Sequence, residues 1–402
     1  MAEIPELFAN YLSDFSVGET VATALEKHVG AGPEAWQSRE VAAGFCLGKD
    51  PEARLFARPG KRTEIDLHDS RLVKMKKRKK NRFKKKFEKN ASWVTFSIMR
   101  VLFTFIPERA FPYIAHYLEV ISRPFSRRWR RIALENLTLS LGKEKSREEI
   151  GYIYRACFRE AAQNFCELVS GMVSIFRRSS VLNELKEKFI LDGEENLKKA
   201  LARGKGVIGV CAHFGNFTMM GTGLTSRGYP YALVVRPADE SRVETYFREW
   251  RDKMGYDSIP SLPRATAVRR SLSALRENKI LALFADQNKA KGGVFVDFFD
   301  RPAGTVVGPA VIALRTGAPI VPIFSVRQEV SRHRVIIGRA VELEVSGNQE
   351  KDIPAVTAKI TKVIEEFIRK YPTHWWWFHN RWKTKPKKEE EAETPESSSP
   401  FL

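Results

Sequence analysis

The sequence predicts an α/β fold, with a mainly parallel central sheet flanked by helices and an N-terminal helical segment in front of it. Two observations lead to this prediction. From residue 192 onward, short apolar runs typical of buried strands alternate with helical patterns, as in a parallel sheet covered on both faces. Between residues 147 and 176, by contrast, apolar residues recur at three- and four-residue steps, the stripe of a packed helix. Hydrophobic residues make up 43% of the 402, enough for the core of one large domain or two ordinary ones.

Residues 1–73 differ in composition from the rest of the chain. They hold 8 basic and 12 acidic residues, a net charge of −4, and because the whole chain carries +20, residues 74–402 carry about +24. Residues 3–24 have a helical pattern, but residues 30–71 mix Gly, Pro and charged residues with no sustained period. We expect either a poorly ordered acidic extension over 1–73 or a translation start at Met75, whose following residues resemble a natural start.

The next segment, residues 74–107, has the pattern of a membrane-associating anchor. Residues 74–89 contain eleven Lys or Arg and one Glu, and residues 93–107 are apolar apart from Arg100. A span needs about 20 apolar residues, and a charged residue at its centre costs about 2.5–3.5 kcal/mol. A basic run leading into a short apolar, aromatic helix is instead typical of a helix lying in the surface of an anionic leaflet. A tilted single span and a buried core helix are the alternatives.

Helices precede the sheet, and the α/β alternation follows them. Three helices are expected at residues 108–121, 127–141 and 147–176. Strands are expected at residues 206–212, 231–236, 280–285, 294–299, 320–327, 334–338 and 341–345. Further helices are expected at residues 193–203, from Asn216 onward, and at 241–254, 265–277, 308–316 and 353–371. These elements form one domain over residues 108–382, followed by a disordered tail over 383–402.

Charge and cysteine content limit the kind of protein. A net charge of +20 implies an anionic partner: nucleic acid, an anionic membrane or an acidic soluble molecule. Nucleic acid is not expected, because the chain has no helix-turn-helix, RNA-recognition or zinc-finger pattern. The four cysteines are scattered without a CxxC pair, so they indicate neither a zinc site nor a disulfide framework and favour a reducing compartment. No metal ion is expected.

His213 is the sharpest candidate for chemistry. It follows the apolar strand pattern VIGVCA and precedes FGNF, so it lies where ligands bind in an open α/β sheet, beyond the carboxyl end of a strand. A single histidine is more often structural, and position alone leaves that alternative open. Gly215 allows a close backbone approach, and Asn216 has the side chain to cap the following helix.

The residues around His213 begin a longer resemblance. The sequence AHFGNF at 212–217 resembles the HxGNW motif of the lauroyl/myristoyl acyltransferases of lipid A biosynthesis, within the lysophospholipid acyltransferase superfamily. Other family-like blocks follow in order between about residues 87 and 386: RRIALENL, Asn164-Phe165 with Glu167, LDGEENLKKAL, VVRP, FADQ, GVFVDFFDRPAGTVVGPAVIALRTGAPIVP and WWWFHNRWKTKP. A single HxGN is weak, whereas by this ordered set the chain is identified as a member of the family.

The resemblance implies a reaction and its partners. In the family, the motif histidine takes the proton of an acceptor hydroxyl as this attacks an acyl thioester on acyl carrier protein, without a metal ion or organic cofactor. For this chain it implies an O-acyltransferase whose partners are acyl carrier protein, a phosphorylated glycolipid of the lipid A precursor type and an anionic membrane surface. The implied location is the cytoplasmic face of the inner membrane, peripheral or single-pass. Another lipid acceptor, such as a phosphoinositide mannoside, is the alternative.

The sequence departs from the family motif at one position. The family has HxxxxE or HxxxxD, whose carboxylate orients the imidazole and stabilises its cation. Here the fifth residue after His213 is Thr218, and a hydroxyl accepts an imidazole N–H but supplies no charge. Three explanations stay open: Asp286, at the end of the strand pattern ILALFA, replaces the carboxylate; Thr218 suffices; or the chain binds lipid without catalysis.

The resemblance also implies substrate contacts. These fall on seven residues: Gly215, Asn216, Arg236, Gln287, Phe298, Arg301 and Thr305. The plain alternatives are a surface salt bridge for Arg236 of VVRP and core packing for the aromatic loop, residues 295–305. The tryptophan-rich residues 375–382 either lie at the lipid interface, where tryptophan is favoured, or cover the end of the core.

Overall fold

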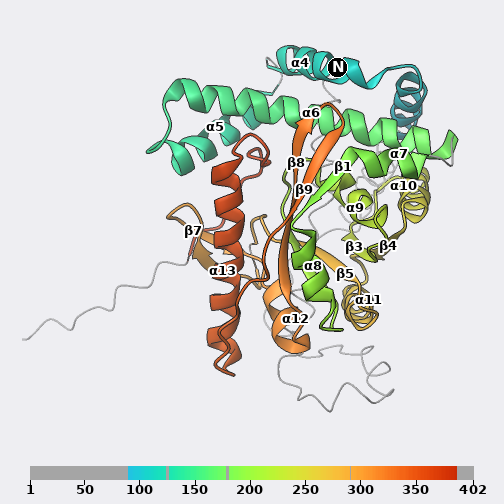
Figure 1. Ribbon diagram of the computed structural model, residues 1–402. Helices are drawn as coiled ribbons and strands as arrows, with labels where there is room; N and C mark the ends of the chain where they lie inside the picture. Colours follow the sequence, from blue (N-terminus) through green and yellow to red (C-terminus); the bar gives the residue numbers. More distant parts are fainter. Residues whose placement is uncertain (1–88, 124–125, 178–180, 290, 387–402) are drawn as a thin grey trace, which may run out of the picture.

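The computed structural model describes residues 89–123, 126–177, 181–289 and 291–386 (Figure 1). The expected acidic extension, Met75 and most of the basic run lie outside the described residues, as does the chain from residue 387 onward. The first residues of the expected tail are described, and there the Thr384 hydroxyl accepts a hydrogen bond from the Asn288 side chain at 3.0 Å.

A seven-stranded sheet forms the centre of the molecule, in the order β1-β9-β8-β2-β5-β3-β4 (Figure 1). Its strands are β1 (Phe189–Asp192), β2 (Val207–Cys211), β3 (Tyr231–Val235), β4 (Tyr256–Pro260), β5 (Ile280–Phe284), β8 (Ile320–Glu329) and β9 (Arg332–Ile337). Neighbouring strands pair in parallel, except for β8 and β9, which are antiparallel. The prediction of a mainly parallel sheet flanked by helices is confirmed. A separate antiparallel pair consists of β6 (Val294–Asp297) and β7 (Pro302–Thr305).

The alternation of side chains along the strands supplies two hydrophobic cores, one on each face of the sheet. On β2, Ile208 and Val210 belong to the first core, whereas Val207 and Cys211 belong to the second. A strand that is buried on both faces reads as a continuous apolar run, which is why VIGVC was recognisable in the sequence.

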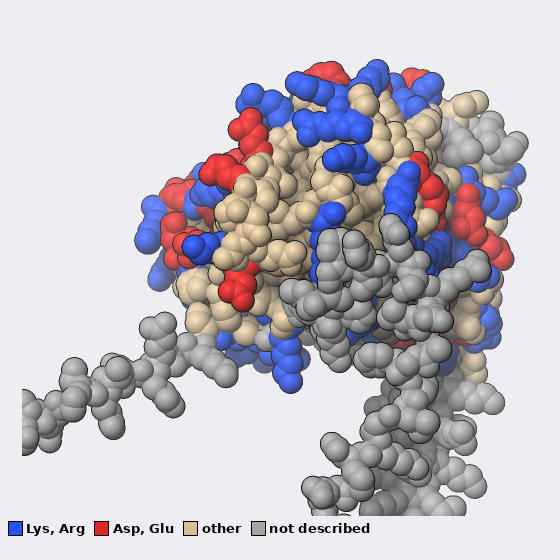
Figure 2. Space-filling view, turned by 90° about the horizontal axis from the view of Figure 1, so that it is seen from below, with Lys and Arg blue, Asp and Glu red and all other residues tan. Residues whose placement is uncertain are grey.

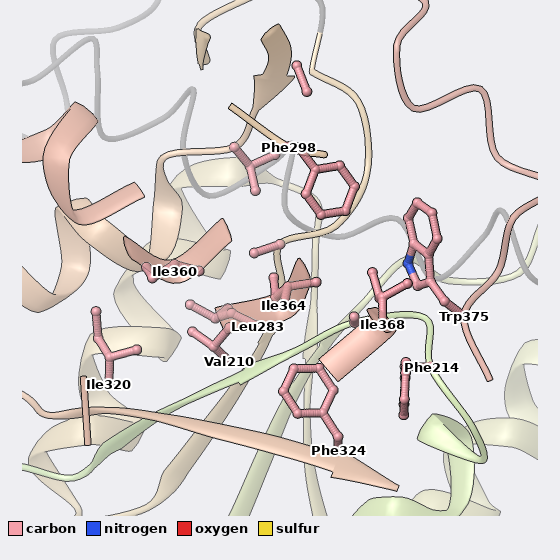
Figure 3. Packing of buried hydrophobic residues seen from close by; sticks show 14 of the residues in the cluster. Val210, Phe214, Leu283, Phe298, Ile320, Phe324, Ile360, Ile364, Ile368 and Trp375 are labelled. Carbon is pink, nitrogen blue, oxygen red and sulfur yellow. The ribbon is translucent and has the colours of Figure 1, made fainter. Parts of the chain in front are cut away.

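Helices cover both faces of the sheet. The first core is covered by α11 (Arg264–Arg276), α12 (Gly308–Thr316) and α13 (Gln349–Lys370). The second is covered by α8 (Glu194–Leu201), α9 (Phe217–Thr225) and α10 (Ser241–Lys253). On α13, Ile360, Ile364 and Ile368 recur at four-residue steps and face the strands, where Val210 and Leu283 belong to the same core (Figure 3).

A long helix, α6 (Arg147–Arg177), lies across one end of the sheet and contributes to both cores (Figure 1). Its first half supplies Ile153 and Cys157 to the first core, and its second half supplies Leu168 and Met172 to the second. The helices α4 (Phe111–Ser122), which follows the short η3 (Glu108–Ala110), and α5 (Arg127–Leu141) pack against α6, as does α7 (Val181–Lys188). One helix therefore ties the N-terminal helices to the sheet.

Most elements lie within a few residues of their expected ranges, and α5 and α12 match theirs. The strand expected at 341–345 is wrong: these described residues form no strand, although the Val341 N–H donates to the Ile320 carbonyl at 2.8 Å. The last β8–β9 pair at this end is Ile323 with Ile337, and beyond it the chain keeps two backbone bonds to β8, this one among them, before it leaves the sheet. The sequence does not predict β1, β4, β7 or α7. Edge strand β4 mixes polar residues into its pattern and ends at Pro260, which only an edge or a strand end tolerates.

Residues 89–103 form a helix with one packed and one exposed side. On the packed side, the Phe96 ring lies 5.3 Å from Tyr246 and 5.8 Å from Phe247 of α10, and the Arg100 guanidinium lies 3.9 Å from the Tyr246 ring. Large apolar side chains of residues 94–105 and of α4 face solvent: Val94, Ile98, Val101, Leu102, Phe105, Tyr113, Tyr117, Val120 and Ile121. The alternative of a buried core helix is therefore wrong. Among the described residues, no helix has the length and apolar character needed to cross a membrane.

Candidate active site

His213 and Asp286 meet at the carboxyl ends of two neighbouring parallel strands. Strands β2 and β5 pair with Cys211 opposite Phe284, and each polar residue follows two positions later. The Nδ1 atom of His213 lies 2.9 Å from Oδ1 of Asp286, and the backbone N–H of His213 donates to Oδ2 at 3.0 Å. The register of the sheet thus brings a carboxylate to the histidine.

Asp286 is a buried carboxylate with three hydrogen-bond donors. The third donor is the indole N–H of Trp375, whose Nε1 lies 2.8 Å from Oδ2. Burial raises the pKa of a carboxyl group, but the charge and hydrogen bond of His213, together with Trp375, outweigh burial and hold the pKa of Asp286 at about 2. An ionised carboxylate only accepts, so Nδ1 of His213 carries a proton, and in the neutral ring Nε2 keeps its lone pair. His213 therefore has the tautomer of a general base.

Gln287 lies against the face of the His213 ring. Its amide nitrogen is 3.3 Å from Nε2 and 3.5 Å from Nδ1. The lone pair of Nε2 lies in the ring plane and points away from Nδ1, so an atom at nearly equal distances from both nitrogens sits over the ring instead of along the lone pair. The rings of Phe217 and Phe284 pack at 5.1 and 5.0 Å from the imidazole. The imidazole is thus held by a carboxylate, an amide and two aromatic rings.

A small pocket reaches His213 from the side of α6. Asn164, Phe217 and Trp376 are among the residues that line it, and its volume of about 20 Å³ is room for about one water molecule. A larger cavity of about 50 Å³ is lined by Asn216 but not by His213. We place the site at the smaller pocket, because the base lies there.

The turn after His213 needs a glycine and is closed by an asparagine. Gly215 has a φ of +53°, and a Cβ atom there would lie 1.8 Å from the carbonyl oxygen of Ser325. Asn216 caps α9, since its side-chain oxygen accepts from the Met219 N–H at 3.2 Å. The cap and the close approach follow the sequence-based expectation, and a contact of these two residues with substrate stays a prediction.

Thr218 belongs to the helix cap. Its hydroxyl donates to Oδ1 of Asn216 at 2.9 Å. It lines the same pocket as His213, but the imidazole Nδ1–H is taken by Asp286. Of the two candidate partners for the imidazole, the structure brings Asp286 to the ring nitrogen.

Arg236 directly follows β3, the neighbour of β5 in the sheet. The carboxyl ends of parallel neighbours share one edge, so this exposed side chain lies at the same edge as His213 and Asp286. Gln287 contacts the imidazole itself. These two positions fit a substrate-binding role, which stays a prediction.

The aromatic loop packs into the core behind Trp375. Phe298 is 1% exposed, and its ring lies 5.6 Å from that of Trp375. Thr305 is fully buried, and its hydroxyl donates to a nearby backbone carbonyl at 2.9 Å. The guanidinium of Arg301 lies 5.6 Å from the Trp382 ring. Phe298 and Thr305 are thus part of the core, Arg301 is partly buried beside Trp382, and a contact of these three residues with substrate stays a prediction.

The C-terminal segment forms a wall of the site that the sequence does not predict. It is held to the turn that carries His213 by the backbone N–H of Trp376, which donates to the His213 carbonyl at 3.0 Å. Three of its tryptophans are 1, 0 and 5% exposed: Trp375, Trp377 and Trp382. For these three, the lipid-interface alternative is wrong. No local pattern in WWWFHN predicts that the indole of its first residue, Trp375, donates to a carboxylate.

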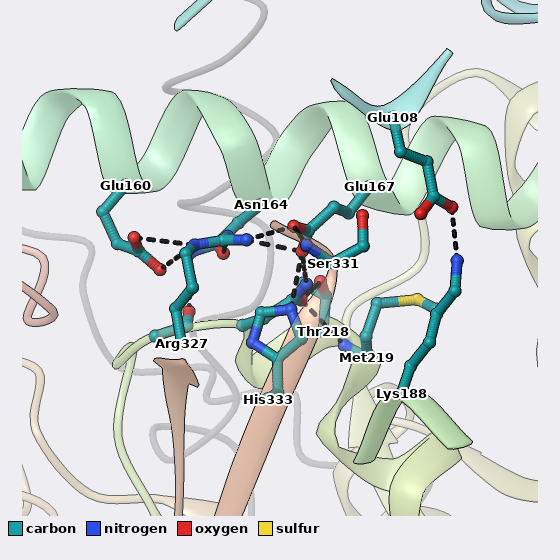
Figure 4. Close-up of polar contacts among 12 residues, drawn as sticks. Glu108, Glu160, Asn164, Glu167, Lys188, Thr218, Met219, Arg327, Ser331 and His333 are labelled. Carbon is teal, nitrogen blue, oxygen red and sulfur yellow. Dashed lines mark hydrogen bonds and ion pairs between the residues drawn. The ribbon is translucent and has the colours of Figure 1, made fainter. Parts of the chain in front are cut away.

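A second buried polar cluster lies behind the turn, between α6, β8 and β9 (Figure 4). Arg327 donates through Nε to both carboxylate oxygens of Glu160, at 3.0 and 2.9 Å, and also pairs with Glu167. The Nε2 atom of His333 lies 2.8 Å from Glu167. Burial opposes ionisation of Glu167, but the charges and hydrogen bonds of His333 and Arg327 hold its pKa at about 2. The sequence singled out Glu167 only as part of a family-like helix.

The fold and the site together define a class of protein. A parallel α/β sheet carries a buried carboxylate–imidazole pair at its carboxyl edge, in a His-x-Gly-Asn turn, and this arrangement suits acid–base catalysis on a hydroxyl group. Residues 80–384 match the family described as bacterial lipid A biosynthesis acyltransferase. The match covers most of the chain, and the chain belongs to this family. The resemblance drawn from the sequence is confirmed.

Individual relatives are similar at modest identity. The chain is 27% identical over 197 residues to the phosphatidylinositol mannoside acyltransferase of Mycobacterium tuberculosis, a match covering 48% of this chain and 60% of that protein. It is 26% identical over 310 residues to the lipid A biosynthesis palmitoleoyltransferase of Escherichia coli K12, covering 76% of this chain and 96% of that protein. A lipid A biosynthesis acyltransferase of Haemophilus influenzae is 24% identical over 214 residues, covering 52% and 64%. The chain thus spans about 60% of the mannoside acyltransferase and nearly all of the palmitoleoyltransferase.

Proposed function

We propose that the protein is an O-acyltransferase that moves a fatty acyl chain from acyl carrier protein to a hydroxyl of a phosphorylated lipid A precursor. The observation that carries the proposal is the His213–Asp286 pair, in which a buried, ionised carboxylate fixes the tautomer of a base. Family membership supports acyl transfer as the class of reaction. A lipid-binding protein without catalysis gains nothing from such a pair, and we place that alternative last.

The residues of the site suggest a sequence of steps. Nε2 of His213 takes the proton of the acceptor hydroxyl while the hydroxyl oxygen attacks the thioester carbonyl carbon. Asp286 stabilises the imidazolium that forms. The tetrahedral intermediate then collapses, the C–S bond breaks, and the departing thiolate takes the proton back from Nε2. The products are an acyl ester and the free thiol of the carrier protein, and no step needs a metal ion or an organic cofactor. Gln287, beside Nε2, is the residue that we place at the reacting atoms.

The acyl chain enters from the pocket beside α6. A volume of about 20 Å³ does not hold an acyl chain. Phe217 and Trp376 line the pocket and therefore move when the chain binds. Both are aromatic side chains that offer apolar contact to the chain once they have moved.

A phosphatidylinositol mannoside or a related glycolipid is the alternative acceptor. The Mycobacterium tuberculosis relative carries that acceptor in its name. Both candidate acceptors are phosphorylated lipids with sugar hydroxyls, so the same base serves either. The longer match to the Escherichia coli palmitoleoyltransferase makes the lipid A precursor our first choice.

The positive charge of the chain favours such partners. Acyl carrier protein is acidic and both candidate acceptors are phosphorylated, whereas residues 74–402 carry about +24 when the −4 of residues 1–73 is taken from the total of +20. Figure 2 shows Lys and Arg side chains spread over one face, with smaller groups of Asp and Glu between them. The attraction therefore extends beyond the N-terminal basic run.

We place the protein on the cytoplasmic face of the inner membrane, held by residues 74–121. The basic run attracts anionic head groups, and the exposed apolar side chains of residues 94–121 enter the interface. The variant Val101→Asp/Leu102→Asp changes two side chains that are 61 and 54% exposed, and it weakens binding to anionic vesicles about tenfold or more in a sedimentation assay. Leu262→Asp, at a position 58% exposed elsewhere, is the matched control. Equal binding by both variants refutes the placement.

The function is tested with the purified full chain. It is incubated with acyl-loaded carrier protein and either a lipid A precursor or a phosphatidylinositol mannoside, and the lipids are analysed by mass spectrometry. A gain of one acyl mass on the lipid A precursor, dependent on the loaded carrier, is the expected result. Acylation of the mannoside alone selects the alternative acceptor. Lipid binding without any transfer overturns the catalytic function.

A further inference from the structure

The orientation of the Asn216 amide depends on one carboxylate. Its Nδ2 donates to Oε2 of Glu167 at 2.6 Å, a short charge-assisted hydrogen bond in a buried place. With the nitrogen so engaged, Oδ1 faces the start of α9, where it accepts from Thr218 and Met219. The reverse orientation would set the amide oxygen against the carboxylate and the amide nitrogen against the Met219 N–H. Glu167 therefore decides which way the cap of α9 faces.

Glu167 is itself fixed by donors from β8, β9 and the turn between them. Arg327 pairs with it, and the Ser331 backbone N–H donates to its Oε1 at 3.0 Å. Nε2 of His333 lies 2.8 Å from its Oε2 (Figure 4). The residue is 7% exposed and ionised, so it is a stationary acceptor.

The same arginine directs a second amide onto the turn. Nη2 of Arg327 donates to Oδ1 of Asn164 at 2.5 Å, which leaves Nδ2 of Asn164 to donate to the Gly215 carbonyl at 2.9 Å. Gly215 and Asn216 are therefore both held by amide groups whose orientation is set by one ion cluster. These two residues lie directly after His213 and Phe214 in the chain, so the cluster fixes the turn that carries the base.

We propose that Glu167 is a positioning residue, which through the amide of Asn216 fixes the turn that carries His213 and does not itself touch substrate. The inference rests on the proposed function. Taking charges out of water is costly, and an apolar cluster of the same volume is often as stable as a buried ion cluster. Orientation of the turn is what the charged cluster adds here.

The test exchanges donor and acceptor across the 2.6 Å contact. Asn216→Asp keeps the side-chain shape and a good cap for α9 but sets two carboxylates against each other, and kcat for acyl transfer falls about 100-fold. Adding Glu167→Gln to the same chain restores one amide donor, one carboxylate and the total charge of the cluster. The double variant recovers kcat to within about tenfold of the original protein, with KM for the acyl donor unchanged throughout.

A double variant no faster than Asn216→Asp alone overturns the proposal, because a residue with a general structural role gains nothing from the exchange. Hydrogen exchange of the backbone amides of residues 213–219 in the full chain provides a readout independent of activity. Exchange is expected to be faster in Asn216→Asp than in the original protein, and to return to the original rate in the double variant. If the original protein transfers no acyl group while exchange follows this pattern, the proposed function fails and the positioning role stands.

Two further variants keep the test decisive. Asn348 caps α13 at an exposed position, accepting from the Glu350 N–H at 3.0 Å, so Asn348→Asp is the control for a change of cap alone and leaves kcat unchanged. If Asn216→Asp does not fold, Asn164→Asp replaces it, since this change keeps an acceptor for Arg327 and removes the donor to Gly215. For Asn164→Asp we expect a kcat that is about tenfold lower, with KM unchanged. An unchanged kcat overturns the proposal.

Discussion

Two buried carboxylate–imidazole pairs lie in the part of the chain that the structure describes, and they differ in what else surrounds the carboxylate. In the first pair, Asp286 accepts from the ring and backbone of His213 and from the indole of Trp375, which are neutral donors while the ring is neutral. In the second pair, the carboxylate that faces His333 also pairs with a permanent cation on β8. The same two kinds of side chain thus meet in two electrostatic settings.

The difference shows how one chemical pair serves two purposes. The hydrogen-bond partners of Asp286 are a histidine and an indole, so this carboxylate is placed to supply the counter-charge to the imidazolium that forms in the proposed reaction. In the second pair Arg327 lies between two carboxylates, Glu160 and Glu167, and the imidazole of His333 and the amide of Asn216 contact Glu167, which completes a fixed cluster. The two pairs differ in the further partner of the carboxylate, which is an indole in the first and a guanidinium in the second; the first pair suits the base of the proposed reaction, and the second suits a fixed support of the turn.

The largest effect is expected when the first pair is broken. His213→Ala and Asp286→Asn each lower kcat for acyl transfer by about 10³- to 10⁴-fold, because the base or its tautomer is lost. The double variant is no slower than the slower single variant, since the two residues act as one unit. Steady-state kinetics measure this, and circular dichroism checks the fold. Multiplying losses would show that the two residues act independently.

Removal of the permanent cation from the second pair is expected to act on stability. Arg327→Met leaves Glu160 and Glu167 buried without their main partner, and the free energy of unfolding falls by about 3–5 kcal/mol. Urea titration measures the change. Arg270→Met, which breaks a half-exposed ion pair with Asp257 at 2.9 Å, is the control and changes stability by less than about 1 kcal/mol. Equal effects at both arginines would contradict the comparison.

The indole donor is expected to have a smaller effect that depends on pH. Trp375→Phe removes the hydrogen bond to Asp286, which lowers the free energy of unfolding by about 1.5–3 kcal/mol and raises the pKa of the carboxyl group above its value of about 2. The ionised Asp286 stabilises the fold above its unfolded pKa of about 3.9, and this contribution is lost as pH falls toward the folded pKa.

In Trp375→Phe the pKa of Asp286 in the folded state lies closer to its pKa in the unfolded state, so less stability is lost between about pH 4 and pH 2. Denaturant titrations at several pH values measure this loss. Trp377→Phe is the control, because its indole donates to the Pro372 carbonyl at 2.7 Å and not to a carboxylate. The two variants differ in the slope of stability against pH. Identical slopes would remove the special role of Trp375.

The smallest effect is expected at Thr218. Thr218→Val removes one donor to Asn216, costs about 1 kcal/mol of stability and changes kcat by less than about threefold. The reason is that the imidazole is held by Asp286 instead. A loss of kcat as large as that of Asp286→Asn would reassign the partner of the base.

The central strands of the fold were predictable because burial on both faces leaves a continuous apolar run, as in VIGVC of β2 and ILALF of β5. The edge strands were not. Both β1 and β4 lie at the ends of the sheet and are partly exposed: FILD has only three apolar residues before Asp192, and polar residues interrupt YDSIP. The VELEV pattern of residues 341–345 alternates like a strand, but pattern alone does not say whether a neighbour is free to pair.

The candidate site was predictable where it depends on local order. His213 and Asp286 each end an apolar strand, and parallel neighbours bring such ends together. Trp375 follows Asp286 by 89 residues, and Arg327 follows Glu167 by 160. Contacts at such separations are set by how the segments dock, and no periodicity or motif in either segment encodes the partner.

The place of Trp375 late in the chain has a consequence for the timing of synthesis. The chain leaves the ribosome with its N-terminus first, so His213 and Asp286 emerge well before Trp375, which lies 89 residues beyond Asp286. Until the C-terminal segment docks, the carboxylate lacks its third donor and lies open to water. A nascent chain in which the sheet has already formed therefore still lacks one of the three donors to Asp286, and the site that we propose is complete only when the last segment has docked.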